Sequence, residues 1–492
     1  MDEVMATALS NSILAQPLDR VRLPNYSRAA LSPGIVHIGV GNFHRAHQAI
    51  YLDDLFSQGS DLDWAIIGAG VRETDAQMRQ RLMAQDFLST VIELDPNGNA
   101  ARICGSMVDY APVESRAVIE ALSRPEIRIA SLTITEGGYY LNSIGGFDST
   151  HPEIQHDAGN ENTPRTIFGM LLAAICARRN NGSPPLTIMS CDNIPGNGEV
   201  ARATLHGLAD MISSSLGDWI NAEMAFPNSM VDRITPATGG RERALAKDEF
   251  DIEDTCPVVC ETYRQWVVED SFVSGRPRLE DVGVEFVENV ATYELMKLRI
   301  LNGGHAAIAY PAALMGLTYA HEAMAVPLIA GFMAKLARTE VIPTLPNIPG
   351  INFDDYLAVI QRRFSNPKIG DTIQRLCEDG SNRQPKFILP TIHDRLATGQ
   401  SVDGLALEVA LWCRYCASDE AVSASGELSD PRSNVLIESA RAAKSNPAAF
   451  LAIKDVFGDL GENSVFSNAF ARSLTLLWQQ GVASTLTAFN SA

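Results

Sequence analysis

Apolar residues first gather in the run GIVHIGVG at residues 34–41, which ends in glycines. The segment that follows, NFHRAHQAIYLDDLF, has apolar positions at helical spacing, and the apolar run WAIIGAGV at 64–71 predicts a second strand. A strand, a glycine turn and a helix in this order are typical of the start of a nucleotide-binding βαβ unit. Residues 1–30 are predicted to be a loosely structured lead-in.

Three further runs rich in apolar and β-branched residues predict strands at 89–94, 127–135 and 186–193. The segments ESRAVIEALS and TIFGMLLAAICARR, which lie between these runs, have the composition of helices. Strands and helices that alternate in this way predict a mostly parallel sheet covered on both faces, because such strands are apolar at nearly every position.

The pattern changes near residue 290, after which apolar positions recur at helical spacing and strand-like runs nearly vanish. The expected fold class is therefore α/β. It combines a Rossmann-type, mostly parallel sheet in an N-terminal domain, residues 1–290, with a mainly α-helical C-terminal domain, residues 291–492. The clearest helical segments are YELMKLRILNGGHAAIAY, VPLIAGFMAKLARTEV, FDDYLAVIQRRF and LALEVALWCRYCA.

The charge balance removes two classes of partner. Acidic residues outnumber basic ones by 59 to 39, and the net charge of −20 should repel nucleic acid and anionic membranes. The N-terminus carries acids where a secretory signal has basic residues. The most apolar segment, 306–320, is shorter than the ~20 residues that a bilayer requires and contains Pro311, so we expect a buried helix there. A cytoplasmic protein is the expectation.

The eight cysteines are too sparse for a disulfide framework in a chain of this length. Cys256 and Cys260 flank three residues, and Cys413 and Cys416 flank two, so the two pairs could in principle hold zinc. CPVVC resembles a buried strand, however, and LWCRYC a helix face. We therefore expect buried free thiols and no metal.

The glycine turn Gly39-Val40-Gly41 would let the backbone approach a pyrophosphate at a helix N-terminus. His44 stands where the third glycine of a G-x-G-x-x-G motif should fall, so a tight turn without a ligand remains an alternative. Glu73 and Asp75, beyond the second strand, favour NAD because a carboxylate repels a 2′-phosphate. Arg72 could instead pair with such a phosphate, and a solvated loop of mixed charge is the third possibility.

A second candidate site lies in the segment from Glu294 to His305. In a regular α-helix, Glu294, Lys297, Asn302 and His305 would share an arc of about 140°. A surface helix would expose such a face to water. Two features favour a buried site instead: the helix continues into an apolar run, and the glycine pair 303–304 would interrupt it, as close approach to a ligand requires.

The chemistry of these residues suits the oxidation of an alcohol. Desolvation lowers the pKa of a buried lysine, so that Lys297 could act as a base near neutral pH. Asparagine amides can donate hydrogen bonds to the developing alkoxide. Asn302 supplies one amide, and Asn193 lies at the C-terminal end of a predicted strand, where open α/β sheets bind ligands.

Six motifs resemble the polyol-specific long-chain dehydrogenases/reductases, the family of the mannitol 2-dehydrogenases and of the fructuronate and tagaturonate reductases. The resemblance runs from about residue 34 to near the C-terminus, and its most specific part is K-x4-N-G-x-H at 297–305. The motifs are GVGNFHRAHQA, SLTITEGGY, TIMSCDN, FPNSMVDRITP, QWVVEDSFVSGRP and YELMKLRILNGGH.

The resemblance implies a Rossmann-type domain, a helical domain and a mechanism without zinc. It implies that Lys297 is the general base, that Asn193 and Asn302 bind the alkoxide, that His305 orients the substrate and that Glu294 relays the proton toward solvent. The substrate hydroxyl contacts that it implies are Arg375, Lys386 and Asp232. The expected cofactor contacts are Gly39, Gly41, Asn42, Phe43, Arg72, Asp75 and Glu136.

These observations predict the NAD-dependent, metal-independent oxidation of a sugar alcohol to a ketose. D-mannitol giving D-fructose is the leading substrate pair, with D-arabinitol and D-sorbitol as close alternatives, and we expect a monomer. Hexuronate reduction is the rival activity, for which a bidentate arginine such as Arg375 or Arg383 would be available. The alternative from another functional class is a nucleotide-binding module with the same fold and no catalytic activity.

Overall fold

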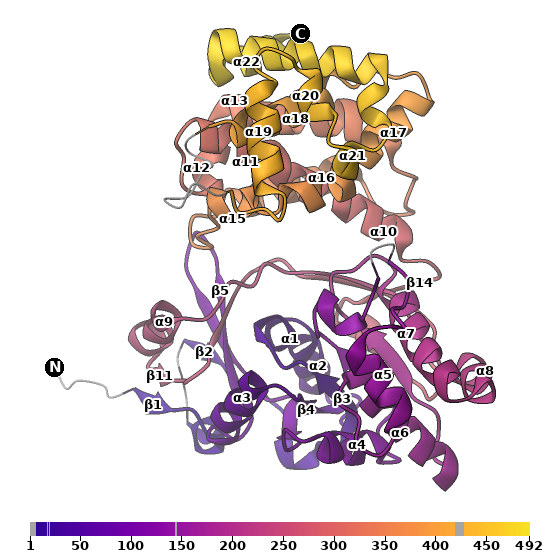
Figure 1. The fold of residues 1–492 in the computed structure, drawn as a ribbon. Helices are drawn as coiled ribbons and strands as arrows, with labels where there is room; N and C mark the ends of the chain where they lie inside the picture. The colour runs from indigo at the N-terminus through magenta and orange to yellow at the C-terminus, as the bar shows by residue number, and fades with distance from the viewer. Residues whose placement is uncertain (1–5, 17, 19, 143–144, 419–427) are drawn as a thin grey trace, which may run out of the picture. The chain divides into compact units, whose positions relative to one another are not determined.

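The computed structural model describes residues 6–16, 18, 20–142, 145–418 and 428–492. The chain divides into two compact units, Met1–Ala291 and Thr292–Ala492, and each is described by itself (Figure 1).

The first unit is built on a five-stranded sheet in which every neighbouring pair of strands is parallel. Its strand order is β7-β4-β3-β8-β9, so the order along the sheet reverses beside β3, between β3 and β8. The predicted α/β class is confirmed. The strands are β3 (Pro33–Ile38), β4 (Ala65–Ala69), β7 (Met107–Tyr110), β8 (Ile129–Leu132) and β9 (Thr187–Ser190).

Both faces of this sheet are buried at its central strands, which explains why β3 and β4 are apolar at nearly every position. Val36 and Ile67 point into a core that they share with helices α4 (Ser115–Ser123), α6 (Ile167–Asn181) and α7 (Asn197–Ile212). Ile35 and Ile66 point to the opposite face, toward helix α2 (Gln48–Ser57). A strand that packs on both sides has no face left for polar residues.

The run at residues 89–94 forms a strand, β5 (Ser89–Leu94), but its assignment to the parallel sheet is wrong. It lies in a four-stranded sheet of order β12-β5-β6-β2, which also contains β12 (Val258–Glu261), β6 (Ala100–Cys104) and β2 (Val21–Arg22). β5 pairs antiparallel with β6 because the segment DPNGN, residues 95–99, closes a hairpin between them. The Asp95 carboxylate accepts the Asn97 backbone N–H at 2.9 Å within this turn.

The lead-in is more ordered than its sequence predicts. β1 (Thr7–Ala8) pairs in parallel with β11 (Ile252–Glu253), and β2 adds an edge strand beside β6. Leu9 and Ile13 are buried. Strands of two residues are too short to show a period of two, so the hydrophobic pattern could not reveal them.

The second unit is helical, as predicted. Helix α18 carries the segment LALEVALWCRYC and is buried along nearly its whole length, which accounts for its apolar residues on every side. The longer helices of this unit are α11 (Gly303–Leu314), α13 (Pro327–Leu336), α14 (Phe353–Phe364), α18 (Asp403–Cys416) and α22 (Ser464–Ser491).

The apolar segment beginning at residue 306 belongs to α11, whose residues are largely buried. Within the described residues, no helix is both long and apolar enough to cross a membrane. All eight cysteines carry free thiols, and Cys256, Cys260, Cys413 and Cys416 are buried, as expected for the two pairs.

Candidate active site

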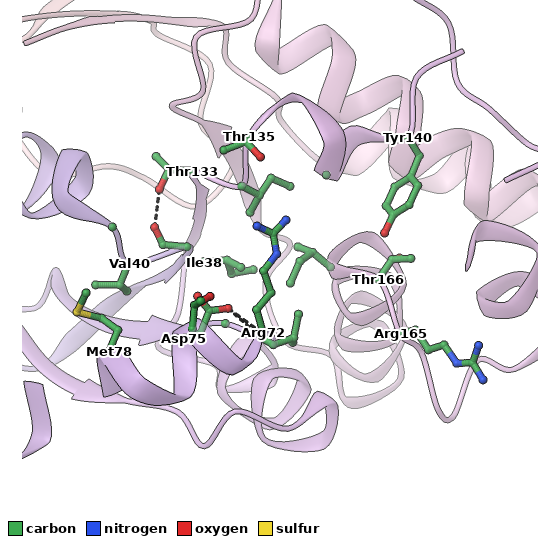
Figure 2. A pocket seen from close by; sticks show the side chains of 18 residues that line it. Ile38, Val40, Arg72, Asp75, Met78, Thr133, Thr135, Tyr140, Arg165 and Thr166 are labelled. Atoms are coloured by element: carbon green, nitrogen blue, oxygen red, sulfur yellow. Dashed lines mark hydrogen bonds between the residues drawn. The ribbon is translucent and has the colours of Figure 1, made fainter. Parts of the chain in front are cut away.

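A pocket of about 340 Å³ lies at the carboxyl ends of β3, β4 and β8 (Figure 2). This is the point at which the strand order reverses, where open α/β sheets bind their ligands. The volume falls within the range of small-molecule sites, ~300–1,000 Å³. Its lining comes from three turns and one helix start: residues 38–41, residues 70–78, residues 133–140 and residues 165–167.

Gly39 and Gly41 both line this pocket, but for different physical reasons. Gly39 has φ +95°, and an added Cβ would lie 2.2 Å from the carbonyl oxygen of Thr133, so the turn itself requires glycine. Gly41 has φ −101°, and the nearest atom to an added Cβ is the carbonyl oxygen of Gly39 at 3.8 Å. The space above Gly41 is therefore left open to a ligand, which fits the close approach of a dinucleotide pyrophosphate.

We therefore expect Gly41→Ala to fold like the wild type and to bind NADH at least about tenfold more weakly, because the new methyl group would occupy the ligand's space. NADH fluorescence titration and the thermal unfolding midpoint without cofactor would measure the two effects. Gly159→Ala, which also has open space around its added Cβ but lies outside the pocket, is the matched control. Equal NADH affinity in both variants would contradict a pyrophosphate at this turn.

Two stacked histidines support the glycine turn from within the fold. His37 Nε2 lies 3.0 Å from Thr133 Oγ1 and 3.3 Å from the Gly39 carbonyl oxygen. The His44 ring stacks on His37 with a centroid distance of 3.4 Å. Burial lowers the pKa of His37 to about 3 and the pKa of His44 well below its usual value. His44 thus fills, as a neutral packed ring, the place where a third glycine was expected.

These lowered pKa values predict acid sensitivity. The folded state disfavours the charged form of these imidazole rings. Below pH ~6.5 a histidine in the unfolded chain binds a proton, whereas the buried ring stays neutral. The free energy of unfolding therefore decreases as the pH falls. Each such histidine removes up to ~1.4 kcal/mol per pH unit. The free energy of unfolding of His44→Phe should therefore fall less steeply than that of the wild type between pH 6 and pH 4, in denaturant titrations.

His393, which is exposed, provides the comparison for this measurement. His393→Phe should keep the wild-type pH dependence. If the free energy of unfolding depends on pH with the same slope in the wild type and in His44→Phe, then protonation of His44 does not destabilise the folded state.

Asp75, predicted to bind the ribose, lines the pocket but also has a structural role. Its Oδ2 accepts the backbone N–H groups of Val71 and Arg72, both at 2.9 Å, and so caps the N-terminus of helix α3 (Glu73–Met83). Arg72 extends into the pocket from the same turn (Figure 2). The carboxylate and the guanidinium therefore both line the pocket.

Three other expected cofactor contacts are not among the residues that line the pocket: Asn42, Phe43 and Glu136. The Asn42 amide donates to the Pro236 carbonyl and to Thr238 Oγ1, at 3.2 and 3.1 Å, and thereby ties helix α1 (Asn42–Ala46) to a neighbouring loop. Phe43 stacks on a histidine ring of the same helical segment, and Glu136 is exposed.

The turn after β8 contributes pocket residues that sequence reasoning did not single out. Thr133, Thr135 and Tyr140 line the pocket, and Thr133 Oγ1 donates to the Gly39 carbonyl at 2.7 Å (Figure 2). The motif SLTITEGGY, which contains Thr133 and Thr135, was used above only as part of the resemblance to the polyol dehydrogenases. Thr133, Thr135 and Tyr140 lie at or just beyond the end of the strand predicted at 127–135, and this position was the signal that could have identified them, since ligands bind at such strand ends.

In the second unit, Lys297 and Asn302 do not lie on a regular α-helix. α10 (Ala291–Met296) leads into the π-helix η5 (Lys297–Asn302), which leads into α11. Residues five apart are about 140° apart on an α-helix, whereas a π-helix joins residues i and i+5 by hydrogen bonds along one side. The π-turn therefore brings the backbones of Lys297 and Asn302 toward the same face. Lys297 is 8% exposed.

The predicted interruption at the glycine pair 303–304 is wrong. Gly303 has φ −62° and ψ −36°, and α11 begins there as a regular helix. An added Cβ on Gly304 would lie 2.8 Å from the terminal methyl carbon of Met333 in α13. Gly304 therefore permits two helices to pack closely, rather than the approach of a ligand.

His305 lies in a buried, positively charged setting. Its ring stacks on Phe364 at a centroid distance of 4.1 Å, and its Nε2 lies 3.9 Å from Asp371 Oδ2. Burial first, and then the charges of Arg375, Arg383 and Arg363, hold the pKa of His305 well below its usual value. The ring is therefore neutral near pH 7 and can orient a hydroxyl group. The structure thus places two expected substrate contacts, His305 and Arg375, around one carboxylate.

The remaining predicted residues are distributed over both units. In the first unit, Asn193 is exposed just beyond β9, and Asp232 is the buried last residue of β10 (Ser229–Asp232). In the second unit, Glu294 is half-buried on α10, and Lys386 is exposed on α16 (Gly380–Phe387).

A pocket at the reversal point of a Rossmann-type sheet is typical of nucleotide-binding proteins, and the helical unit adds a buried lysine. Residues 33–281 match the model of the mannitol dehydrogenase Rossmann domain, and residues 289–478 match that of the mannitol dehydrogenase C-terminal domain. The chain belongs to the mannitol dehydrogenase family, and the resemblance inferred from its motifs is confirmed.

Relatives and solved structures agree with this assignment. Mannitol 2-dehydrogenase of Cereibacter sphaeroides is 55% identical over 474 residues, which cover 96% of this chain and 99% of the relative. The ternary complex of Pseudomonas fluorescens mannitol 2-dehydrogenase with NAD and D-mannitol has a TM-score of 0.83 at 42% identity, covering 99% and 100% of the two chains. A substrate-free D-sorbitol dehydrogenase has a TM-score of 0.89 at 30% identity, covering 98% and 100%.

Proposed function

We propose that this protein catalyses the NAD-dependent oxidation of a sugar alcohol to the matching ketose, with D-mannitol and D-fructose as the leading pair. The similarity to mannitol 2-dehydrogenases over nearly the whole chain supports this activity. The open space above Gly41 supports a dinucleotide in the pocket of the first unit. D-sorbitol is the second candidate substrate, because a D-sorbitol dehydrogenase shares the fold at 30% identity.

The pairing of Arg375 is one observation that favours a polyol over a hexuronate. A hexuronate carboxylate would be held best by an arginine with a free bidentate fork. Arg375 donates through Nε and Nη2 to the two oxygens of Asp371, each at 2.7 Å. Arg383 donates through Nη1 to the backbone carbonyls of Leu376 and Glu378, at 2.9 and 3.2 Å. The Nε and Nη2 groups of Arg375 are thus already paired with Asp371, whereas Arg383 is bonded within the protein through its Nη1.

In the proposed mechanism, bound NAD supplies the hydride acceptor. Lys297 removes the hydroxyl proton, and Glu294 passes that proton toward solvent. The amides of Asn193 and Asn302 donate hydrogen bonds to the oxygen as its negative charge develops. The neutral His305 ring, with Arg375, Lys386 and Asp232, orients the remaining hydroxyl groups.

The mechanism is proposed to need no metal. Among the described residues, no group of three or more His, Cys, Asp or Glu side chains is arranged to hold a metal ion. Lys297 is proposed to accept the proton of the substrate hydroxyl directly.

One assay tests this function directly. The protein is incubated with NAD or NADP and with D-mannitol, D-sorbitol, D-arabinitol, D-mannonate or D-altronate, and reduced nicotinamide is followed by absorbance. We expect the highest kcat/KM with NAD and a hexitol. Higher efficiency with a hexonate would favour the hexuronate reductase, and higher efficiency with NADP would assign Arg72 to a 2′-phosphate. Cofactor binding without turnover of any substrate would favour the non-catalytic module.

A further inference from the structure

The turn after β8 holds two residues in unusual backbone conformations at the edge of the pocket. Thr135 has φ 66° and ψ 163°, a region that essentially only glycine populates. Tyr140 has φ 52° and ψ 53°, the left-handed region. The two residues flank the short 3-10 helix η3 (Glu136–Tyr139), and both line the pocket (Figure 2). A threonine in this conformation persists only when its surroundings hold it there.

One carboxylate provides much of that restraint. Asp192 Oδ1 accepts the backbone N–H of Thr135 at 2.9 Å, and its Oδ2 accepts the backbone N–H of Ile134 at 2.9 Å. The Tyr139 hydroxyl donates to the same Oδ2 at 2.7 Å. Asp192 is 8% exposed and Tyr139 is fully buried, so these bonds are shielded from water. Charge-assisted bonds of this kind are the stronger ones in proteins.

Asp192 is also the sequence neighbour of a proposed catalytic residue. It follows the end of β9 at Ser190 by two residues and immediately precedes Asn193, a proposed alkoxide donor. The Asn197 amide donates to the Asp192 backbone carbonyl at 2.9 Å and fixes this segment in turn. A single buried residue therefore joins the turn that lines the pocket to the segment that carries Asn193.

We propose, given the NAD-dependent function proposed above, that Asp192 is a positioning residue that holds the Thr133–Tyr140 turn in the strained form that binds the dinucleotide. The strain at Thr135 indicates why a carboxylate is needed. Without the two carboxylate oxygens that accept the backbone N–H groups of Ile134 and Thr135, the turn should relax toward conformations that threonine prefers, and the pocket wall would move. Asp192 itself does not line the pocket, so its effect passes through the turn.

The first test is NADH affinity in Asp192→Asn, which keeps the shape of the side chain but offers one acceptor oxygen and places an NH2 group against a backbone N–H. We expect NADH to bind at least about tenfold more weakly in fluorescence titrations. Asp254→Asn is the matched control. Asp254 is likewise buried and accepts the backbone N–H groups of Thr90 and Cys256, both at 2.8 Å, and the Gln85 amide at 3.0 Å, but it lies outside the pocket lining.

A rescue distinguishes positioning from simple stabilisation. Thr135→Gly removes the cost of the unusual backbone conformation, so it should restore the NADH affinity of Asp192→Asn to within about threefold of Thr135→Gly alone. Asp254→Asn should gain nothing from Thr135→Gly. If Asp192→Asn binds NADH like the wild type, or if Thr135→Gly leaves its affinity unimproved, Asp192 does not act through this turn.

Tyr139→Phe offers a milder version of the same test should Asp192→Asn fail to fold, because it removes one of the three donors and leaves both backbone bonds. Its NADH affinity should fall about threefold and should also recover with Thr135→Gly. An unchanged affinity in Tyr139→Phe would then count against the proposal. Because NADH binding is measured without any polyol, the result is independent of whether a polyol proves to be the substrate.

Discussion

Replacing Lys297 with alanine should lower kcat for polyol oxidation by about 10²–10⁴-fold, the range attributed to general acid–base catalysis. Without a side-chain base, the hydroxyl proton would have to leave to water while the alkoxide forms. Lys297 is 8% exposed and begins the π-helix η5, so water has poor access to replace it. Steady-state kinetics with saturating NAD, together with NADH titrations, would separate the loss of turnover from any loss of cofactor binding.

Lys297→Arg sharpens this experiment, because arginine keeps the positive charge but cannot be deprotonated in a protein. It should be about as inactive as Lys297→Ala, and small primary amines should partly rescue only the alanine variant. The wild-type oxidation rate should rise with pH over the range in which the lysine loses its proton, and Lys297→Ala should lose that dependence. Substantial activity in Lys297→Arg would assign the lysine to charge stabilisation rather than to proton transfer.

The same mechanism predicts that prolonged treatment with a strong chelator leaves wild-type activity unchanged. A zinc-dependent dehydrogenase polarises the hydroxyl with a Lewis acid instead of a base, and removing the metal abolishes turnover. Activity that falls with the chelator and returns with zinc would therefore overturn the role of Lys297. Cys256 and Cys260 would be the first residues to examine in that case, since they are buried and close in sequence.

The parts of the fold that could be predicted are those in which the hydrophobic pattern is set by burial over a whole element. Val36 and Ile35 pack on opposite faces of the sheet, so a strand with no polar face was a clear signal. β5 is also apolar because it is buried. It belongs to the four-stranded sheet, however, because a hairpin pairs it with β6, and its apolar residues do not indicate that pairing. Apolar strands show that they are buried and do not show which strand lies beside them.

The candidate site was predictable where its residues are neighbours in the sequence. Gly39, Gly41, Arg72 and Asp75 line the pocket, and each lies close to the end of a predicted strand, which can be located from the sequence. Thr135 was missed because its conformation depends on a carboxylate 57 residues further along the chain. No local signal reports such a contact.

The π-helix was missed for a related reason. A helical period of 3.6 already places the four polar residues of Glu294 to His305 within one arc, so the pattern gave no sign that the segment contains a π-turn. The π-turn matters for the chemistry because Lys297 and Asn302 are five positions apart, the spacing that a π-turn brings to one face of the helix.

Asn302 is therefore the nearest candidate amide in sequence to the proposed base, and Asn302→Ala should slow hydride transfer by about 10²–10³-fold while NADH affinity stays nearly unchanged. Asn193→Ala should have the same effect. A preorganised amide stabilises the charge that appears on oxygen only as the proton and the hydride leave, so its loss affects the reaction step more than ground-state binding. Single-turnover measurements with saturating NAD and D-mannitol would isolate that step.

Asn352→Ala is the contrasting control. The Asn352 side chain caps α14 by accepting the backbone N–H groups of residues 354 and 355, at 2.9 and 3.2 Å. Its loss should lower the free energy of unfolding by about 1 kcal/mol and leave hydride transfer intact. A variant at Asn193 or Asn302 that binds NADH poorly but transfers hydride at the wild-type rate would move that asparagine from the alkoxide to the cofactor.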